Sequence, residues 1–227
     1  MDLHVSRKEK KFFTNRAIVL QLMKRIDAQL DRDANSKSLL GYPVRSLYFD
    51  SPFDQDYWEV LQGIEERRKI RMRIYRPDDT IVKLEHKYKL GDCQQKTSIS
   101  LTRKQAQAIM NGEVDSLLKS TSAGALSIFK AFRMEVYRPR VLIEYNRIAW
   151  VGPMNDTRLT WDTNIRVSRT DFSLLSPHVN WTMLTDESVG VFEVKYNGFL
   201  NSYIEQMLEP LNGLPEAFSK YALSCAL

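Results

Sequence analysis

The sequence predicts an α+β protein built on an antiparallel sheet of about eight strands, large enough to close into a barrel. Two observations predict this class. The expected strands are joined mostly by turns with few helices between them, which is how antiparallel strands are connected. Charged residues also recur one residue apart in strand-like segments, as in Glu9 and Lys11. This spacing directs both charges to one face and their apolar neighbours to the other.

Apolar residues recur at strand or helix spacing along the first half of the chain, and these spacings predict its elements. In chain order they are a helix over 14–30, a strand over 45–50, a helix over 54–62, a hairpin of strands over 64–75 and 81–88, a strand over 96–101, and helices over 103–111 and 124–132. Thr14 or Asn15 would cap the first of these helices, and Thr102 the third. Tyr57 and Leu61 would face inward from the second.

The second half is rich in strands, which are expected over 136–145, 148–151, 158–162, 164–169 and 189–196. Helices over 199–208 and 218–226 close the chain. No internal repeat, low-complexity tract or linker interrupts these elements. A single domain over residues 1–227 is therefore expected.

Charged side chains fall on one face of strand after strand. Arg71 and Arg73 alternate with Ile70, Met72 and Ile74, whose apolar face needs cover. The same alternation gives Lys83, Glu85 and Lys87, Arg158 and Asp162, and Glu193 and Lys195. Burying each charge in a dry interior would cost several kcal/mol, against a net stability of about 5–15 kcal/mol. The sheet is therefore either open with one wet charged face or closed around a solvated tunnel whose cations await an anion.

The overall charge mildly favours anionic partners such as phosphates, nucleic acid or anionic lipid. Lys and Arg outnumber Asp and Glu by 33 to 28, which gives a net charge of +5. A face that binds nucleic acid does not need carboxylates such as Glu9, Glu85 and Glu193 beside its cations. The basic residues are also not interleaved with the aromatic residues on which bases would stack. Carboxylates do suit a metal–phosphate site, because Mg²⁺ and Mn²⁺ take oxygen ligands. Nucleic acid is therefore not the expected partner.

The sequence lacks the motifs that mark several other classes of protein. No apolar run approaches a membrane span and the N-terminus is not a signal peptide, so a cytoplasmic protein is expected, with docking to a membrane partner left open. His4, His86 and His178 form no zinc-binding motif. No nucleotide-binding glycine motif or nucleophile elbow occurs either. Cys93 and Cys225 lie far apart in the sequence and are interpreted as reduced thiols.

Short motifs along the chain resemble, in the same order, those of the VTC (vacuolar transporter chaperone) domain. They are Arg7-x-Glu9-x-Lys11-Phe12, Ser46-x-Tyr48-Phe49-Asp50 followed by Tyr57, Arg71-x-Arg73-x-Tyr75, Glu85-x-Lys87, Tyr145-x-Arg147, Arg158 with Asp162-Thr163-Asn164, Phe192-Glu193-x-Lys195 and Phe218-Ser219-Lys220-Tyr221. The VTC domain belongs to the triphosphate tunnel metalloenzymes, which also include the CYTH-type hydrolases. The resemblance covers nearly the whole chain.

This resemblance implies an eight-stranded antiparallel tunnel barrel with flanking helices, lined by Lys and Arg, that binds ATP or another triphosphate and polyphosphate with Mn²⁺ or Mg²⁺. It implies a polyphosphate polymerase that moves the terminal phosphoryl of ATP onto a chain. The phosphate ligands by motif match are Lys11, Arg71, Arg73, Lys87, Arg147, Arg158 and Lys220, with Lys83, Lys96 and Lys195 as further substrate contacts. Glu193 would hold the metal, and Glu9 and Glu85 would support it or orient neighbouring cations.

Two other functions stay open. A hydrolase of triphosphate or nucleoside triphosphate would use the same fold, and no residue decides whether water or a phosphate chain attacks. A non-catalytic polyphosphate-binding module is the third reading. The absence of a Ser, Cys or His nucleophile motif does not count against phosphoryl transfer, which needs mainly positioning and charge neutralisation. A polymerase whose product crosses a membrane would need a separate membrane partner, and the sequence does not indicate the oligomeric state.

Overall fold

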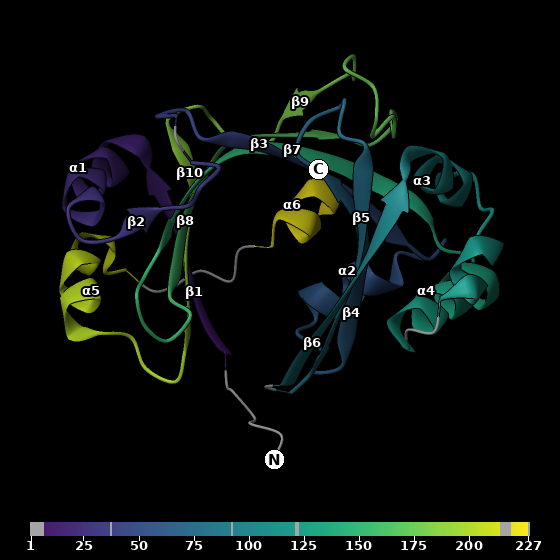
Figure 1. The fold of residues 1–227 in the computed structure, drawn as a ribbon, viewed down its shortest axis with the longest axis horizontal. Coiled ribbons are helices and arrows are strands. Elements are labelled where there is room, and N and C mark those ends of the chain that lie inside the picture. Colours follow the sequence, from purple (N-terminus) through teal and green to yellow (C-terminus); the bar gives the residue numbers. More distant parts are fainter. Residues whose placement is uncertain (1–6, 37, 92, 121–122, 214–218, 227) are drawn as a thin grey trace. The chain divides into compact units, whose positions relative to one another are not determined.

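The computed structural model describes residues 7–36, 38–91, 93–120, 123–213 and 219–226 (Figure 1). The chain divides into two compact units. The first unit comprises Met1–Pro43, Tyr145–Arg166 and Met183–Phe218. The second unit comprises Val44–Glu144, Val167–Thr182 and Ser219–Leu227. Each unit therefore combines segments that are far apart in the sequence.

The chain forms runs of consecutive strands with helices between the runs. The strands are β1 (Arg7–Asn15), β2 (Asp31–Arg32), β3 (Tyr42–Asp50), β4 (Arg67–Ile74), β5 (Ile81–Leu90), β6 (Cys93–Thr102), β7 (Arg138–Val151), β8 (Arg158–Ser168), β9 (Thr182–Met183) and β10 (Val189–Asn197). The α-helices are α1 (Arg16–Asp27), α2 (Gln55–Leu61), α3 (Arg103–Met110), α4 (Ala123–Met134), α5 (Ser202–Met207) and α6 (Lys220–Ala226), with 3₁₀ turns at Asp115–Lys119 and Glu209–Leu211.

Neighbouring strands pair in the order β1-β10-β8-β7-β3-β4-β5-β6, and β2 and β9 add short pairs to β7 and β8. The pairs β1–β10, β10–β8, β3–β4, β4–β5 and β5–β6 are all antiparallel. The α+β class, with a large antiparallel sheet and flanking helices, is therefore confirmed.

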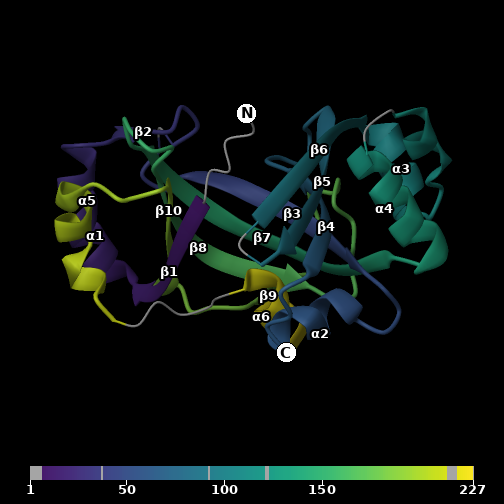
Figure 2. The same cartoon turned by 90° about the horizontal axis from the view of Figure 1, so that it is seen from below.

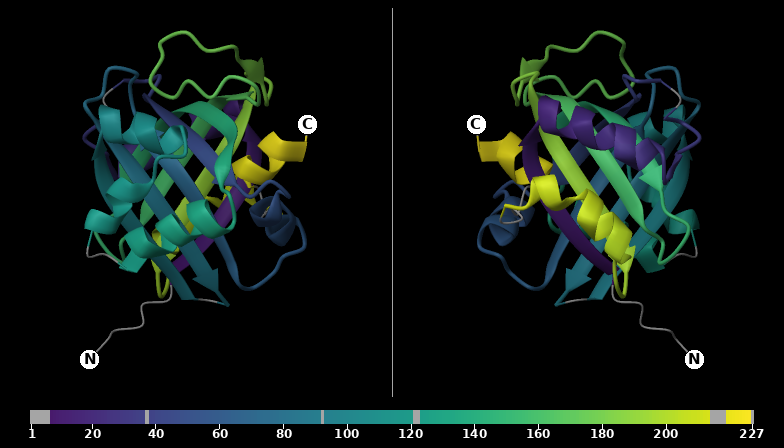
Figure 3. Two further views of the ribbon diagram at one scale, coloured as in Figure 1. Left: turned by 90° about the vertical axis from the view of Figure 1, so that its right-hand side faces the viewer. Right: turned by 90° about the vertical axis from the view of Figure 1, so that its left-hand side faces the viewer.

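In the first unit, α1 and α5 cover one face of the strands β1, β10 and β8 (Figure 3, right). Apolar residues from that face, including Leu159 and Phe192, pack with Leu22 and Ile26 of α1. The Asn15 side chain accepts a hydrogen bond from the Ile18 N–H and caps α1, as predicted for one of two candidates. The helix nevertheless ends at Asp27 rather than at Leu30. Leu30 lies beyond the end of the helix but is buried, and this is why its apolar side chain fits the helical spacing.

In the second unit, α3 and α4 cover one face of the strands of β4, β5 and β6 (Figure 3, left). Ile70, Met72 and Leu84 are fully buried against these helices. Thr102 begins α3 with the predicted cap, because its hydroxyl accepts from the Gln105 N–H while the Gln105 side chain accepts from the Thr102 N–H. Figure 2 shows β4, β5 and β6 side by side, with α2 and α6 packed together near them.

Two predicted strand breaks are wrong. The segments expected over 136–145 and 148–151 are one strand, β7, in which Arg147 hydrogen-bonds to Asp162 of β8. The segments over 158–162 and 164–169 are likewise one strand, β8, in which Asn164 takes a positive φ of 51° without ending the strand. Polar residues inside these strands therefore do not interrupt them.

Leu61 also differs from its prediction. The prediction placed it in the core, but it is 52% exposed, at the end of the short helix α2. The only buried side chain of that helix is Asp56, so the apolar spacing of its sequence does not mark a core face. Among the described residues, no helix is long and apolar enough to cross a membrane. Cys225 has a free thiol, and the side chain of Cys93 lies outside the described part of the chain.

The two leucines Leu84 and Leu61 test this packing. Leu84→Ala removes a side chain with no exposed surface and should lower the free energy of unfolding by about 2–5 kcal/mol, because the cavity cannot close fully. Leu61→Ala should change it by about 0.5 kcal/mol or less, as surface substitutions do. Urea unfolding of both variants measures the difference. Equal losses would contradict the assigned core.

Candidate functional site

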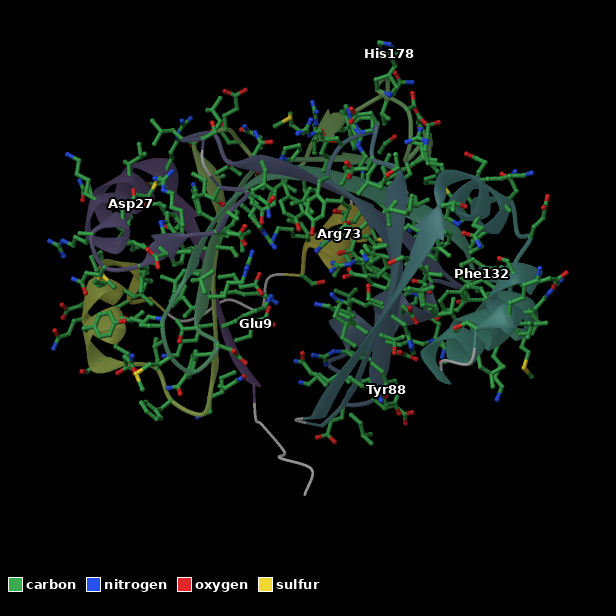
Figure 4. The ribbon with its side chains drawn as sticks, viewed as in Figure 1. Glu9, Asp27, Arg73, Tyr88, Phe132 and His178 are labelled. Carbon is green, nitrogen blue, oxygen red and sulfur yellow. The ribbon has the colours of Figure 1, made fainter. Side chains whose placement is uncertain are left out.

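On the first unit, strand register brings charged residues into rows on the face opposite to α1 and α5. One row across β1, β10 and β8 contains Lys11, Glu193 and Thr160, and the next contains Glu9, Lys195 and Arg158. Figure 4 shows Glu9 on the other side of these strands from Asp27, which lies on α1. Residues opposite each other in antiparallel strands share a face, so the predicted charged surface of this unit is present.

The charges on this face are largely neutralised within the unit. The Lys11 ammonium lies 2.5 Å from a carboxylate oxygen of Glu9, and the Lys195 ammonium pairs with Glu193. Both lysines are partly exposed, whereas the Glu193 side chain is only 6% exposed. Because each carboxylate has a cation beside it, this face has oxygen donors and cations in alternation.

Arg147 and Arg158 already have acidic partners. Arg147 donates two parallel hydrogen bonds to Asp162, of 2.7 and 2.8 Å, and Arg158 donates one of 2.6 Å to Asp33. Burial alone would lower the pKa of Arg147, but the fully buried Asp162 carboxylate raises it well above its usual value, so the guanidinium stays charged. These arginines are therefore fixed cations whose positions are set by carboxylates.

Two glycines support this pair. A Cβ on Gly190 would lie 2.4 Å from the carbonyl oxygen of Asp162, and one on Gly41 would lie 2.2 Å from that of Arg147. Gly41 also has a positive φ of 72°, which glycine adopts without steric cost. Only glycine therefore allows the backbone to approach both members of the pair so closely.

On the second unit, rows of residues across β3, β4, β5 and β6 are dominated by cations. One row contains Lys69, Lys87 and Lys96, the next Tyr48, Arg71, Glu85 and Ser98, and the third Ser46, Arg73, Lys83 and Ser100. These residues alternate with the buried Ile70, Met72 and Leu84, so they share the face away from α3 and α4. Figure 4 shows Arg73 on that side and Phe132 of α4 on the other. We refer to these rows as the cationic face.

Glu85 is the one carboxylate in these three rows. Its carboxylate accepts a 2.7 Å hydrogen bond from the Arg71 Nε and pairs with the Lys96 ammonium. Its burial would raise its pKa, but Arg71 and Arg73 outweigh that effect, with Lys96 contributing, and lower the pKa to about 2. Glu85 is therefore ionised at neutral pH and orients Arg71 and Lys96.

Tyr48 shows that the cationic face keeps an excess of positive charge. Its hydroxyl oxygen accepts a 2.9 Å hydrogen bond from Arg71 and is largely buried. Burial would raise the pKa of Tyr48, but Arg71 and Arg73, with a smaller effect of Lys69, lower it to about 8. A phenol gains acidity in this way only where positive charge is not fully compensated. The arrangement can therefore bind an anion with several oxygen atoms.

Helix α6 adds a segment that is remote in sequence. The Lys69 ammonium donates a 3.1 Å hydrogen bond to the Ser219 hydroxyl, one residue before α6 begins at Lys220. Lys220 is half-buried. The C-terminal motif is thus tied to the strand that carries Arg71 and Arg73.

The structure divides the predicted site residues between the units. Glu9, Lys11, Arg147, Arg158, Glu193 and Lys195 belong to the first unit, and Arg71, Arg73, Lys83, Glu85, Lys87, Lys96 and Lys220 to the second. Sequence reasoning assigned no role to Tyr48 or Lys69. The available signal was their spacing: Tyr48 lies two residues from Ser46 in β3, and Lys69 lies two residues from Arg71 in β4. The pairing of Arg147 with Asp162 needed the fold, because strand neighbours are not visible in the sequence.

The carboxylates of the first unit fit a hard divalent cation. Glu193 and Glu9 project from adjacent rows and offer oxygen donors, which Mg²⁺ and Mn²⁺ prefer. No cluster of three or more His, Cys, Asp or Glu residues suited to a metal occurs in the part of the chain that the structure describes. Mg²⁺ typically binds through one or two carboxylates plus substrate phosphates, so a preformed cluster is not required.

Two solved structures resemble this fold. A candidate adenylate cyclase from Bacillus halodurans aligns with a TM-score of 0.52 at 11% identity, over 94% of this chain and 95% of that one. A candidate adenylyl cyclase from Hippeastrum, described as having a dominant triphosphatase activity, aligns with a TM-score of 0.55 at 13% identity, over 96% and 94%. At these identities the similarity concerns the fold, which is that of the triphosphate tunnel proteins.

The sequence itself matches the VTC domain over residues 6–227. Since this match spans nearly the whole chain, the protein belongs to the VTC domain family. No curated protein matches the sequence. The predicted family and fold class are thus confirmed.

The acidity of Tyr48 can be measured directly. An absorbance titration of phenolate should show one tyrosine ionising near pH 8, because Arg71 and Arg73 stabilise its anion. Tyr48→Phe should remove this step, and Tyr75→Phe, at an exposed position, should leave it in place. No ionisation step near pH 8 in the wild-type protein would contradict an uncompensated positive charge on this face.

Proposed function

We propose that the protein is a metal-dependent phosphotransferase that moves the terminal phosphoryl group of ATP onto a polyphosphate chain. The observation that carries this proposal is the excess of cations around Tyr48, where Arg71, Arg73 and Lys69 outweigh Glu85. Membership of the VTC domain family and the triphosphate tunnel fold support it. A surface with this charge suits a ligand that carries several negative charges along its length.

The cations would bind phosphate oxygens in two ways. Arginines such as Arg71 and Arg73 have planar forks that bind phosphate with two hydrogen bonds, whereas lysines act as point charges. The proposed phosphate-binding residues of the second unit are Arg71, Arg73, Lys83, Lys87, Lys96 and Lys220. Those of the first unit are Lys11, Arg147, Arg158 and Lys195. Arg147 and Arg158, already held by carboxylates, would contribute fixed charge.

Glu193 would hold Mn²⁺ or Mg²⁺, with Glu9 in support. When bound, the ion supplies neutralisation of the charge that develops on the transferring phosphoryl group. Glu85 is tied to Arg71 and Lys96, so we assign it to orienting these cations, the second of the two roles that the sequence suggested for it. In this assignment Glu193 holds the metal, whereas Glu85 positions cations.

The reaction needs no side-chain nucleophile. A terminal oxygen of the polyphosphate chain would attack the γ-phosphorus of ATP, and the bond to the β-phosphate oxygen would break to release ADP. Positioning and charge stabilisation account for most of the catalysis in such transfers. The cations of the site provide both, because they hold the phosphates before reaction and stabilise the charge spread over the γ-phosphoryl oxygens.

A triphosphatase is the second candidate function. The described activity of the Hippeastrum protein favours it, because that protein shares the fold over nearly its full length. Water would then replace the chain as the attacking group. We propose a cytoplasmic location for either enzyme, and a separate membrane partner if a polymer product is to cross a membrane.

Incubation with ATP and Mn²⁺ or Mg²⁺ tests the proposal. Polyphosphate resolved by gel electrophoresis is the expected product, and Glu193→Gln should reduce its formation by orders of magnitude while keeping some phosphate binding, because the metal ligand is lost but the cations remain. Glu187→Gln, at an exposed position, is the matched control and should be as active as the wild type.

The products separate the candidates. Inorganic phosphate without chains would favour the triphosphatase and contradict the polymerase. Tight triphosphate binding with neither product would indicate a binding module. Unchanged turnover of Glu193→Gln would contradict its assignment as the metal ligand.

A further inference from the structure

The end of β3 carries a buried carboxylate with an unusual number of donors. Asp50 has no exposed surface and accepts hydrogen bonds from the backbone N–H groups of Ser51, Asp56 and Tyr57, at 2.7, 3.0 and 3.0 Å. These contacts fix its position against the start of α2. A buried carboxylate needs such donors to offset the loss of hydration.

Tyr221 of α6 adds a donor from a remote part of the chain. Its hydroxyl donates a hydrogen bond to Oδ2 of Asp50, and its side chain is almost fully buried. Burial and the Asp50 carboxylate raise the pKa of Tyr221 far above its usual value, so the phenol stays protonated and remains a donor. The phenol is therefore available as a donor to Asp50 at neutral pH.

The Tyr221 ring connects the same helix to the cationic face. It stacks on Tyr48 with ring centroids 5.1 Å apart and planes inclined by 25°. The Lys69 ammonium lies 5.7 Å from the centre of the Tyr221 ring while it donates to Ser219. Tyr48 in turn accepts from Arg71. Helix α6 is thus attached on both sides of Lys220, through Ser219 and through Tyr221.

A helix as short as α6 depends on these contacts. It has only seven residues, Lys220–Ala226, and isolated helices of this length are not stable in water. A further polar contact of α6 comes from Arg169, directly after β8, whose Nε donates to the Ser224 carbonyl at 2.6 Å. Tyr221 therefore holds the first turn, where Lys220 lies, and Arg169 holds the second.

We propose that Asp50 and Tyr221 are positioning residues that hold the first turn of α6 against Tyr48 and thereby place Lys220 for substrate binding. This inference rests on the proposed function, since Lys220 is taken as a phosphate ligand. Asp50 is buried, and its hydrogen bond to α6 comes from Tyr221. Its effect on binding must therefore pass through the position of α6.

Cys225 offers a direct measure of how firmly α6 is attached. This free thiol lies in the last turn of α6, and burial raises its pKa to about 11. In a Cys93→Ser background, Tyr221→Phe should accelerate modification of the Cys225 thiolate by about tenfold or more, the factor expected for one lost hydrogen bond to a charged group. The rate is expressed per thiolate, because the Tyr221 hydroxyl also hydrogen-bonds this thiol and lowers its pKa. Tyr88→Phe removes a phenol–carboxylate bond to Glu66 on the surface and should leave the rate unchanged. An unchanged rate in Tyr221→Phe would overturn the anchoring role.

Triphosphate affinity tests the link to Lys220. Tyr221→Phe should weaken binding of inorganic triphosphate by about as much as Lys220→Ala, and the double variant should lose little more, because both changes remove one contribution. A merely structural role predicts losses that add. Additive losses, or wild-type affinity in Tyr221→Phe, would overturn the positioning role while leaving the proposed function intact. No triphosphate binding by the wild type would instead overturn the proposed function.

The coupling can also be measured in a protein that keeps Tyr221, so that misfolding of the Tyr221→Phe variant cannot explain the result. In the Cys93→Ser protein, saturating triphosphate should slow modification of Cys225, because a ligand bound by Lys220 stabilises the attached helix. A rate that does not respond to bound triphosphate would overturn the proposed coupling.

Discussion

Fixed positive charge on the face of β3 to β6 is the constraint on which the rest of the second unit depends. The opposite face must pack against α3 and α4, so buried apolar residues alternate with charged ones along much of β4 and β5. Hydration and Glu85 offset only part of that charge. The remainder acts on Tyr48, whose pKa falls to about 8 despite its burial. A bound polyanion would remove this electrostatic cost, so the same residues that weaken the free protein would stabilise the complex.

The first unit follows the same strand pattern with a different charge balance. Glu9, Glu193 and Asp162 each lie beside a cation. These ion pairs fix the side chains and leave little net charge among them. Oxygen donors are what a divalent cation requires, and cations are what phosphates require. The first unit therefore offers carboxylates held by lysines and arginine, and the second offers guanidinium and ammonium groups in excess.

Much of this arrangement was predictable because strand periodicity is a local property. The alternation of Arg71 and Arg73 with Ile70 and Met72 was enough to predict which face each would take, and the structure confirms it. The relation between strands was not accessible in this way. Arg147 lay between two predicted strand segments, and its pairing with Asp162 on the neighbouring strand required the fold.

Long-range contacts account for the other residues that the sequence did not assign. Asp50 ends β3 and accepts hydrogen bonds from the nearby backbone N–H groups of Ser51 and Asp56, but its contact with Tyr221 spans most of the chain. The central claim, that the cationic face binds triphosphate, is tested most directly by calorimetric titration of inorganic triphosphate into the wild type and Arg73→Ala. Loss of one charge-assisted contact should weaken binding by about tenfold or more, whereas Arg133→Ala on α4 should bind like the wild type. Equal affinity of all three proteins, or no binding by any of them, would contradict the claim.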